Sequence, residues 1–475
     1  MKNNKDNKRS MPGTIQEKMG VKEMVGYGFT DMAGNLLFCT FSQYILWFYT
    51  EVCGLPEKGA FNAGLVLFIA CFINAILSVV WGSVIDHTRT KWGQSRPWFL
   101  FLAGPFAVTT WLAFFLPSFA GSVEAKFGLA MLTYVLASGC CYCGLSAAMS
   151  AVLPNLTAND SDRVKASSFR MIGGSSGAFI TSLLTMLIVP SLAFAFKGSK
   201  TDTEGLKWGY WILIGVWAVM ACAMLILAFM WMKERNFNPK KHEPMPLKKS
   251  FKALKGNHPW FILAGAFILL WIAQNTRSSQ AAFFAKELTS SIADNYITMI
   301  LNSINVIGVV SSILTPIIVT KYKKVNKFNK TSTLFTGLII CCLFGSLCGI
   351  SLKMSSEAAK IATFFTFYTI SVFGLQMAMG MYFMMFADTV DYGEWKTGIR
   401  APGLLASVGA AFGIQMGSAF GFYVPNLIKQ STSVSFAFIW FPVIVYALSG
   451  LVMILFIPYE RKMDSIRLEL SKRNK

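Results

Sequence analysis

Charged side chains are scarce in this sequence. Asp, Glu, Lys and Arg together make up 14% of the 475 residues, whereas hydrophobic residues make up 54%. A water-soluble domain of this length needs a polar shell, and so few charges cannot supply one. The composition therefore excludes the soluble globular class and predicts that most of the chain lies in lipid.

The groups that carry most enzyme and metal chemistry are also few. There are three histidines, all in or beside the polar segments, and no glycine-rich loop of the phosphate-binding kind. The ten cysteines lie almost entirely within hydrophobic runs, and Cys140, Cys141 and Cys143 lack histidine or further thiol partners at ligand spacing. We therefore expect no catalytic centre, no metal site and no cofactor.

Long hydrophobic runs, by contrast, follow one another through the chain. A helix needs about 20 apolar residues to cross about 30 Å of hydrocarbon. Twelve runs reach this length, and they cover residues 27–51, 62–85, 98–116, 127–153, 171–196, 208–232, 259–285, 295–320, 332–352, 357–387, 402–427 and 434–458. The sequence therefore predicts an all-α membrane protein with twelve transmembrane helices.

Lysine and arginine are distributed unevenly between the polar segments. Most of the 43 basic residues fall in the two termini and the even-numbered loops, which all lie on one side of the membrane. Because basic residues are enriched on the cytoplasmic side, both termini are expected there, in a multi-pass protein of the cytoplasmic membrane. The net charge of +20 is then a topology signal with some attraction to anionic lipid headgroups, and it requires no nucleic acid. We expect a monomer surrounded by membrane lipids.

A basic, proline-containing segment divides the twelve runs into six and six. We expect an N-terminal segment (1–26), a first six-helix bundle (27–232), a cytoplasmic linker (233–258), a second six-helix bundle (259–458) and a basic cytoplasmic tail (459–475). Glycines recur at four-residue spacing at Gly173 and Gly177 and again from Gly409 to Gly421, which lets helices approach closely in lipid. Two parallel six-helix repeats with a central site match the major facilitator architecture.

Two clusters of charge stand at the ends of hydrophobic runs. The segment from Asp388 to Arg400 follows a run, 361–387, that contains no charge. After the second run, Gly82, Asp86 and Arg89 have a spacing that resembles the Gly-x-x-x-Asp-x-x-Arg loop of major facilitators. Facing loops of opposite charge can pair in one conformation and separate in another. We therefore predict a cytoplasmic gate that comprises Asp86, Arg89, Arg163, Asp388, Asp391, Glu394 and Arg400.

Four segments carry a family resemblance. Residues Asp388–Arg400, Trp92–Trp98, Tyr27–Asp31 and Phe48–Leu55 resemble the corresponding parts of the glycoside-pentoside-hexuronide cation symporters, and the resemblance covers nearly the whole chain. It implies a secondary transporter of major facilitator fold that takes up a sugar or glycoside. It also implies a coupling cation, which is H⁺ or Na⁺.

The resemblance places three charged residues at the sugar, namely Asp31, Arg170 and Lys396. A carboxylate and a guanidinium can each form paired hydrogen bonds with neighbouring hydroxyls, and aromatic rings can cover the apolar face of the sugar. Further candidates, polar groups within the runs, are Asn35, Tyr142, Ser146, Ser150 and Arg277. Plainer interpretations remain open: Asp31 as a helix cap, and Arg170 and Lys396 as ordinary cytoplasmic charges. Three interpretations of Arg277 remain open: a ligand of an anionic sugar such as a uronide or sulfonated sugar, a side chain that extends to the outer surface, and half of a buried ion pair.

The predicted cation site departs from the family pattern. The family carries two carboxylates one helical turn apart on the second run, and Asn74 and Ser78 stand at those positions here. The family's acid on the fourth run is likewise Ser146. Neutral oxygens hold sodium weakly, and neither side chain titrates, so Asp31 is the remaining candidate for a proton. We expect weak sodium dependence, with either proton coupling through Asp31 or facilitated diffusion.

Two other classes of function stay open. A lipid or drug carrier of the same fold would need an apolar cavity open sideways, and the Ser, Asn, Gln and Tyr residues of the runs argue against one. A membrane enzyme would need a base beside a nucleophile within the membrane, and the sequence offers none. Transport of a sugar or glycoside is the predicted function.

Overall fold

The computed structural model describes residues 19–56, 62–157, 160–235, 254–288, 310, 314, 330–398, 409–428 and 433–473. Within these ranges every regular element is a helix, apart from one isolated β-bridge between Thr90 and Gly93. The predicted all-α class is confirmed.

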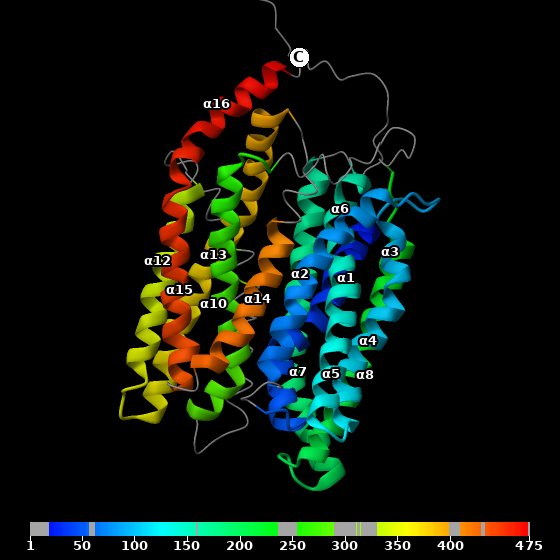
Figure 1. Ribbon diagram of the computed structural model, residues 1–475, viewed down its shortest axis with the longest axis vertical. Coiled ribbons are helices and arrows are strands. Elements are labelled where there is room, and N and C mark those ends of the chain that lie inside the picture. The colour runs from blue at the N-terminus through cyan, green and yellow to red at the C-terminus, as the bar shows by residue number, and fades with distance from the viewer. Residues whose placement is uncertain are drawn as a thin grey trace, which may run out of the picture.

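The helices form two groups that stand side by side (Figure 1). The first group, coloured blue to green, contains α1 (Val21–Thr40), the π-helical turns η1 (Phe41–Ile45) and η2 (Phe48–Val52), α2 (Ala63–His87), α3 (Arg96–Phe101), α4 (Ala103–Phe119), α5 (Val123–Tyr134), η3 (Val135–Tyr142), α6 (Cys143–Leu156), α7 (Asp160–Lys197) and α8 (Thr203–Trp231). The second group, coloured green to red, contains α10 (His258–Leu288), α12 (Lys330–Ser351), α13 (Glu357–Thr397), α14 (Gly409–Ile428), η5 (Phe436–Trp440), α15 (Phe441–Ile454) and α16 (Ile457–Arg473).

Eight of the described helical segments are long and apolar enough to cross a membrane. They are Ala63–Ile85, Val123–Leu153, Phe169–Lys197, Thr203–Trp231, His258–Ala281, Lys330–Ser351, Ala359–Tyr382 and Phe436–Ile454. Helices α1, α4 and α14 lie on three further predicted runs. The predicted run 295–320 lies outside the described residues, apart from positions 310 and 314. The chain is thus a multi-pass membrane protein.

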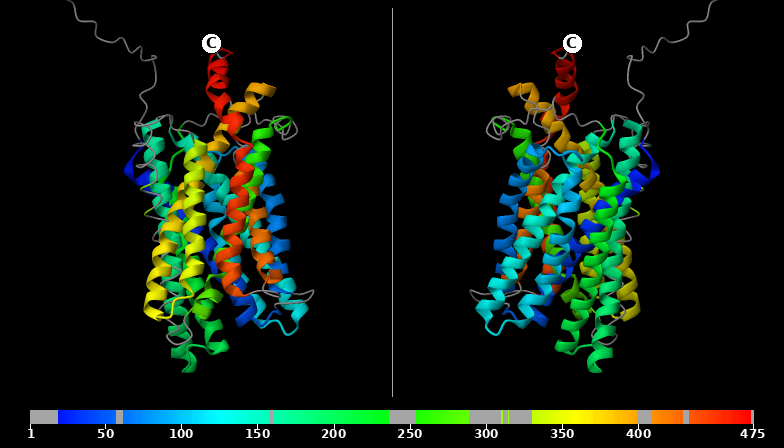
Figure 2. Two further views of the ribbon diagram at one scale, coloured as in Figure 1. Left: turned by 90° about the vertical axis from the view of Figure 1, so that its left-hand side faces the viewer. Right: turned by 90° about the vertical axis from the view of Figure 1, so that its right-hand side faces the viewer.

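The second group projects beyond the first at one end of the molecule (Figures 1 and 2). Helix α13 continues to Thr397, ten residues past the predicted end of its run at 387, and Gly398 ends it with φ 70°. The C-terminal region, predicted only as a basic tail, forms α16. Tyr459 of α16 packs against Tyr392 of α13 at a centroid distance of 5.8 Å, which helps to hold this polar helix in place. We call the end that carries α16 the terminal end and the opposite end the distal end.

Glycines bring helices together within each group. A Cβ on Gly177 of α7 would lie 2.5 Å from the carbonyl oxygen of Met32 on α1. A Cβ on Gly421 of α14 would lie 2.7 Å from Asn275 Cβ on α10. Only residues without a side chain fit such contacts, so the close approach predicted from the glycine spacing is present in both halves.

The two groups meet along α2 and α14. Phe68, near the start of α2, lies against Phe420 and Tyr423 with ring centroids 5.4 and 5.2 Å apart. Further along the interface, Gln415 Nε2 donates to Cys143 Sγ at 3.6 Å. Helix α2 begins at the distal end, so the aromatic contact closes the groups against each other there.

Candidate functional site

An ion pair joins α1 to α7 inside the first group. Asp31 lies about 15 Å along α1 from its first residue, given the rise of a helix. Arg170 Nε donates to Asp31 Oδ2 at 3.3 Å. The Arg170 and Asp31 side chains remain 31% and 17% exposed, so part of each is available for contact. The structure thus brings together two of the predicted site residues.

Two neutral side chains hold this pair in position. Arg170 Nη1 donates to Tyr27 Oη at 3.4 Å, and the Tyr27 hydroxyl donates to the carbonyl oxygen of Met149 at 3.1 Å. Asn35 Nδ2 donates to Asp31 Oδ1 at 3.1 Å and to the Asp31 carbonyl oxygen at 2.9 Å. Three helices, α1, α6 and α7, therefore fix the orientation of the carboxylate and the guanidinium.

A glycine on α7 makes room for the acidic side of this cluster. A Cβ on Gly174 would lie 2.8 Å from Asp31 Oδ2 and 3.0 Å from Asn35 Nδ2. Tyr142 stacks on Phe38, two turns further along the same face of α1, with ring centroids 4.4 Å apart and planes inclined by 9°. The structure thus places Tyr142 beside the helix that carries Asp31 and Asn35.

The predicted serines lie on α6 without a polar contact to the ion pair. The Ser150 hydroxyl donates to the carbonyl oxygen of Ser146 at 3.0 Å, and Ser150 is exposed while Ser146 is half-buried. Among the described residues, neither serine is hydrogen-bonded to Asp31 or Arg170. The Ser150 hydroxyl oxygen can therefore still accept a hydrogen bond from a ligand, and the Ser146 hydroxyl can accept or donate one.

The cluster has the chemistry that a polyhydroxylated molecule requires. The carboxylate of Asp31 accepts hydrogen bonds, the guanidinium of Arg170 donates them, and the Asn35 amide does both. Bonds to the two charged groups are stronger than bonds between neutral groups. The partial exposure of the pair leaves these groups available to a ligand.

Lys396 and Arg277 lie elsewhere in the described structure. Lys396 Nζ, on the terminal extension of α13, donates to the carbonyl oxygen of Gly256 at 3.1 Å. Arg277 is 3% exposed on α10, and its guanidinium lies over the rings of Tyr368 and Tyr446. Both contacts are made within the second group, so neither residue is seen at the Asp31 cluster.

Asn74 and Ser78, the predicted cation-site positions, are buried on α2. The Ser78 hydroxyl donates to the carbonyl oxygen of Ala75 at 2.7 Å. Asn74 is fully buried, and its amide nitrogen and oxygen have no hydrogen-bond partner within the described part of the chain. Gly139 of η3 faces the Asn74 amide so closely that a Cβ there would not fit. An unsatisfied buried amide can accept a ligand or a water.

The predicted gate is described only in part. Lys330 Nζ donates to Asp388 at 2.6 Å, a pair formed between α12 and α13 within the second group. The side chains of Asp86 and Arg163, and residue Arg400, lie outside the described residues. Arg89, Asp391 and Glu394 each have at least one polar or ionic contact. The pairing of this gate between the two halves stays a prediction.

Sequence reasoning missed Glu234, at the terminal end of the first group. Its carboxylate accepts hydrogen bonds from the backbone N–H groups of Gln94, Ser95 and Arg96 at 2.9, 2.8 and 2.6 Å. Glu234 therefore ties the segment after α8 to the first turn of α3, where the helix dipole favours a negative charge. The available signal was a single acid directly after a hydrophobic run and next to basic residues.

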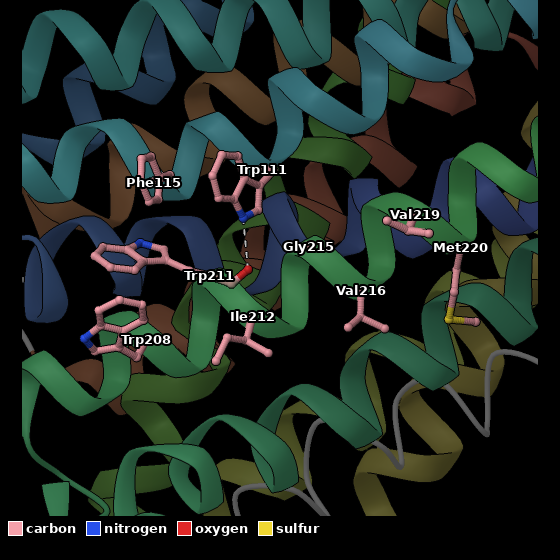
Figure 3. Close-up of a pocket in the computed structure, with 9 residues that line it drawn as sticks. All are labelled: Trp111, Phe115, Trp208, Trp211, Ile212, Gly215, Val216, Val219 and Met220. Atoms are coloured by element: carbon pink, nitrogen blue, oxygen red, sulfur yellow. Dashed lines mark hydrogen bonds between the residues drawn. The ribbon is translucent and has the colours of Figure 1, made fainter. Parts of the chain in front are cut away.

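A groove of about 520 Å³ lies on the outside of the first group, between α4 and α8 (Figure 3). It is lined by Trp111, Phe115, Trp208, Trp211, Ile212, Gly215, Val216, Val219 and Met220. Trp111 Nε1 donates to the carbonyl oxygen of Trp211 at 3.0 Å, so this indole presents its ring rather than its N–H group. The groove includes no residue of the helices that carry Asp31, Asn74 or Arg170, and its apolar lining suits contact with lipid.

Two side-by-side groups of membrane-spanning helices, with a partly exposed polar cluster between helices of one of them, are typical of a membrane transporter. The comparisons with known proteins agree. The family model described as MFS/sugar transport protein matches residues 26–461. The chain therefore belongs to this family of sugar transporters in the major facilitator superfamily.

Two curated relatives are similar along most of their length. The isoprimeverose transporter of Lactiplantibacillus pentosus is 29% identical over 473 residues, which cover 96% of this chain and 92% of the relative. A glucuronide carrier protein homolog of Escherichia coli (strain K12) is 27% identical over 416 residues, which cover 87% of this chain and 84% of the relative.

A solved structure supports the fold. The xylose transporter XylE from E. coli, in a partially occluded inward-open conformation, superposes with a TM-score of 0.62 at 13% identity and covers 92% of this chain and 98% of its own. At this identity the likeness establishes the major facilitator fold alone. The predicted fold, family and absence of an enzymatic role agree with these findings.

Proposed function

We propose that the chain takes up a sugar or glycoside across the cytoplasmic membrane by alternating access, and that the Asp31–Arg170 pair binds its hydroxyls. The observation that carries this proposal is a pair of opposite charges that is held in place by neighbours yet remains partly exposed. Asn35, Tyr142, Ser146 and Ser150 would complete the site from α1, η3 and α6. Lys396 would join only if α13 moves toward the first group.

Sidedness follows from the basic residues and from the distal contact. The positive-inside tendency favours cytoplasmic termini, which makes the terminal end cytoplasmic. The groups meet at Phe68, Phe420 and Tyr423 on the distal side, which favours a site that is closed to the outside and open to the cytoplasm. On closure toward the cytoplasm, the acids of α13 would pair with basic residues of the first group.

The energy source is proposed to be a proton gradient or, without coupling, the sugar gradient itself. Asn74 and Ser78 supply only neutral oxygens, and the described residues contain no cluster of three His, Cys, Asp or Glu side chains that could hold a metal ion. Asp31 is the acid of the Asp31–Arg170 cluster, so its carboxylate would bind the coupling proton. We propose a monomer that needs no cofactor.

Uptake by the purified protein in proteoliposomes tests the proposal. Radiolabelled isoprimeverose is the first substrate, because the corresponding transporter aligns over most of the chain, and a phenyl glucuronide is the second. We expect saturable uptake of at least one, competed by excess unlabelled sugar and lowered by Asp391→Asn at the gate without loss of membrane insertion. Movement of a fluorescent phospholipid without sugar uptake would instead support a lipid carrier.

A further inference from the structure

Arg277 is a buried cation whose described surroundings contain no carboxylate. It is 3% exposed, and its Cζ lies 5.1 Å from the ring centroid of Tyr368 and 5.7 Å from that of Tyr446. The titratable groups that act on it most strongly are those two tyrosines and the thiols of Cys341 and Cys348, all of them neutral when protonated. Its surroundings come from α12, α13 and α15, so it lies in the interior of the second group.

Several hydrogen-bond donors around this guanidinium are unsatisfied. Within the described part of the chain, Arg277 Nε and Nη1 and the Tyr368 hydroxyl have no hydrogen-bond partner. Gln280 is fully buried three residues further along α10, and its amide is unsatisfied as well. Residues three apart share a helix face, so this amide can turn its N–H groups toward the same place.

Contact with aromatic rings does not compensate for the burial of this charge. Even when it is desolvated, a cation over an aromatic ring gains less than the desolvation of one buried ion costs. The Cys341 thiol near the guanidinium is only a weak acceptor. A buried cation with free donors therefore needs a negative partner.

We propose that Arg277, Tyr368 and Gln280 bind a small monovalent anion such as chloride inside the second group. The donors are an N–H pair, a hydroxyl and an amide, which together suit a negative ligand. Gly345 of α12 lies beside the site: a Cβ there would lie 3.6 Å from Arg277 Nη2 and would clash with Val443 Cγ2 at 2.8 Å. The acidic group of a substrate has the same chemistry, but the Asp31 cluster lies in the other group of helices, which favours an inorganic anion.

The orientation of Tyr446 supports a built site. Its hydroxyl donates to Gln274 Oε1 at 3.1 Å, so the ring is held with its face toward the guanidinium. The inference does not depend on which sugar the chain carries, and loss of sugar uptake alone would leave it standing.

Thermal unfolding of the purified full-length protein tests the site. We expect sodium chloride to raise the unfolding temperature by roughly 2–4 °C over sodium gluconate at equal ionic strength, with a saturable dependence on chloride. Arg277→Gln should abolish this difference, and Tyr368→Phe should shift its midpoint to higher chloride. Lys353→Gln removes an exposed cation beyond the distal end of α12 and should keep the wild-type response.

Three outcomes would overturn the proposal. Equal unfolding temperatures in chloride and gluconate would mean that water and the rings satisfy Arg277. Stabilisation by sodium glucuronate but not by chloride, lost in Arg277→Gln, would mean that the site takes the substrate's acid group. If Arg277→Gln does not fold, Arg277→Lys and Tyr368→Phe replace it in the test. A wild-type response to chloride in both of these variants would mean that chloride binds at another site.

Discussion

Asp31 and Arg170 face each other at 3.3 Å although 139 residues separate them along the chain. Each also holds a neutral partner: Asn35 for the carboxylate and Tyr27 for the guanidinium. A sugar hydroxyl can replace the hydrogen bond from Asn35 or to Tyr27, and each charged group then still has a hydrogen-bond partner. The pair is therefore suited to bind and release a neutral, polyhydroxylated ligand.

The first prediction is that Asp31→Asn weakens sugar binding by roughly 1.5–3 kcal/mol, the range for a hydrogen bond to a charged group. The substitution keeps the shape of the side chain and the bond to Asn35 but removes the charge that Arg170 faces. The change is measured as the affinity of the purified protein for its sugar.

Glu204→Gln is the matched control for this change. Glu204 is an exposed acid at the distal start of α8, where it pairs with Lys207 at 2.6 Å. It should leave sugar affinity unchanged. Wild-type affinity in Asp31→Asn would mean that Asp31 is a structural residue of α1.

The second prediction is that Gly174→Ala reduces sugar affinity about tenfold or more while the protein still folds. The new methyl would meet Asp31 Oδ2 and Asn35 Nδ2 at 2.8 and 3.0 Å, so both side chains have to move. A displaced side chain commonly loses its hydrogen bond to the sugar, which lowers the binding free energy by about 1.5 kcal/mol or more for a charged group. The KM for uptake measures the effect.

Gly265→Ala provides the comparison, because a Cβ at Gly265 of α10 would meet nothing within 4 Å. It should raise helix stability slightly and leave uptake unchanged. Equal KM values for Gly174→Ala and Gly265→Ala would show that the room beside Asp31 does not matter for binding.

The third prediction concerns the pair between Lys330 and Asp388. Asp388 is 4% exposed, whereas the Lys330 side chain is 25% exposed and can partly reach water. Asp388→Asn should therefore lower the free energy of unfolding by about 1–3 kcal/mol, less than for a fully buried pair. Denaturant unfolding in detergent measures the change.

A double-mutant cycle with Lys330→Met separates the pair from the other contacts of Asp388. Residues in direct contact show interaction energies of about 0.5–3 kcal/mol in such cycles. Strictly additive effects of Asp388→Asn and Lys330→Met would show that the pair contributes nothing to stability in this state.

The membrane helices could be predicted from the sequence because their signal is local. Long apolar runs are visible without knowledge of packing, and the four-residue spacing of Gly173 and Gly177 predicted a close helix contact without identifying its partner, α1. The continuation of α13 to Thr397 and the formation of α16 could not be predicted in this way. Hydropathy identifies segments that contact lipid. It does not identify a polar helix that packs against another helix outside the membrane.

The sequence predicted which residues belong to the candidate site better than it predicted which of them contact one another. The family resemblance selected Asp31 and Arg170, but residues so far apart meet only through the tertiary fold. Asp388 is expected to pair with a basic residue of the other half when the cavity is closed to the cytoplasm, and this stays a prediction; the Lys330–Asp388 pair within the second group was not foreseen. Many basic residues lie at the terminal end, and charge alone does not select among them.

The last prediction is that sodium stimulates uptake weakly or not at all. Asn74 is fully buried with an unsatisfied amide, and the Ser78 hydroxyl is bonded to the Ala75 carbonyl oxygen. A sodium ion there would exchange its hydration shell for neutral oxygens, without the charge from which such sites gain much of their affinity. Proteoliposome uptake with sodium or potassium outside, at fixed pH and without a proton gradient, measures the difference.

A reciprocal variant sharpens this test. Asn74→Asp restores one carboxylate at the buried position and should introduce sodium stimulation. Asn62→Asp at the N-cap of the same helix, where aspartate caps as well as asparagine, should not. In the wild type, an imposed proton gradient separates the remaining alternatives, because proton coupling through Asp31 accumulates sugar above equilibrium and facilitated diffusion only equilibrates it. Strong stimulation of wild-type uptake by millimolar sodium would show that Asn74, Ser78 and nearby backbone oxygens build a sodium site without an acid.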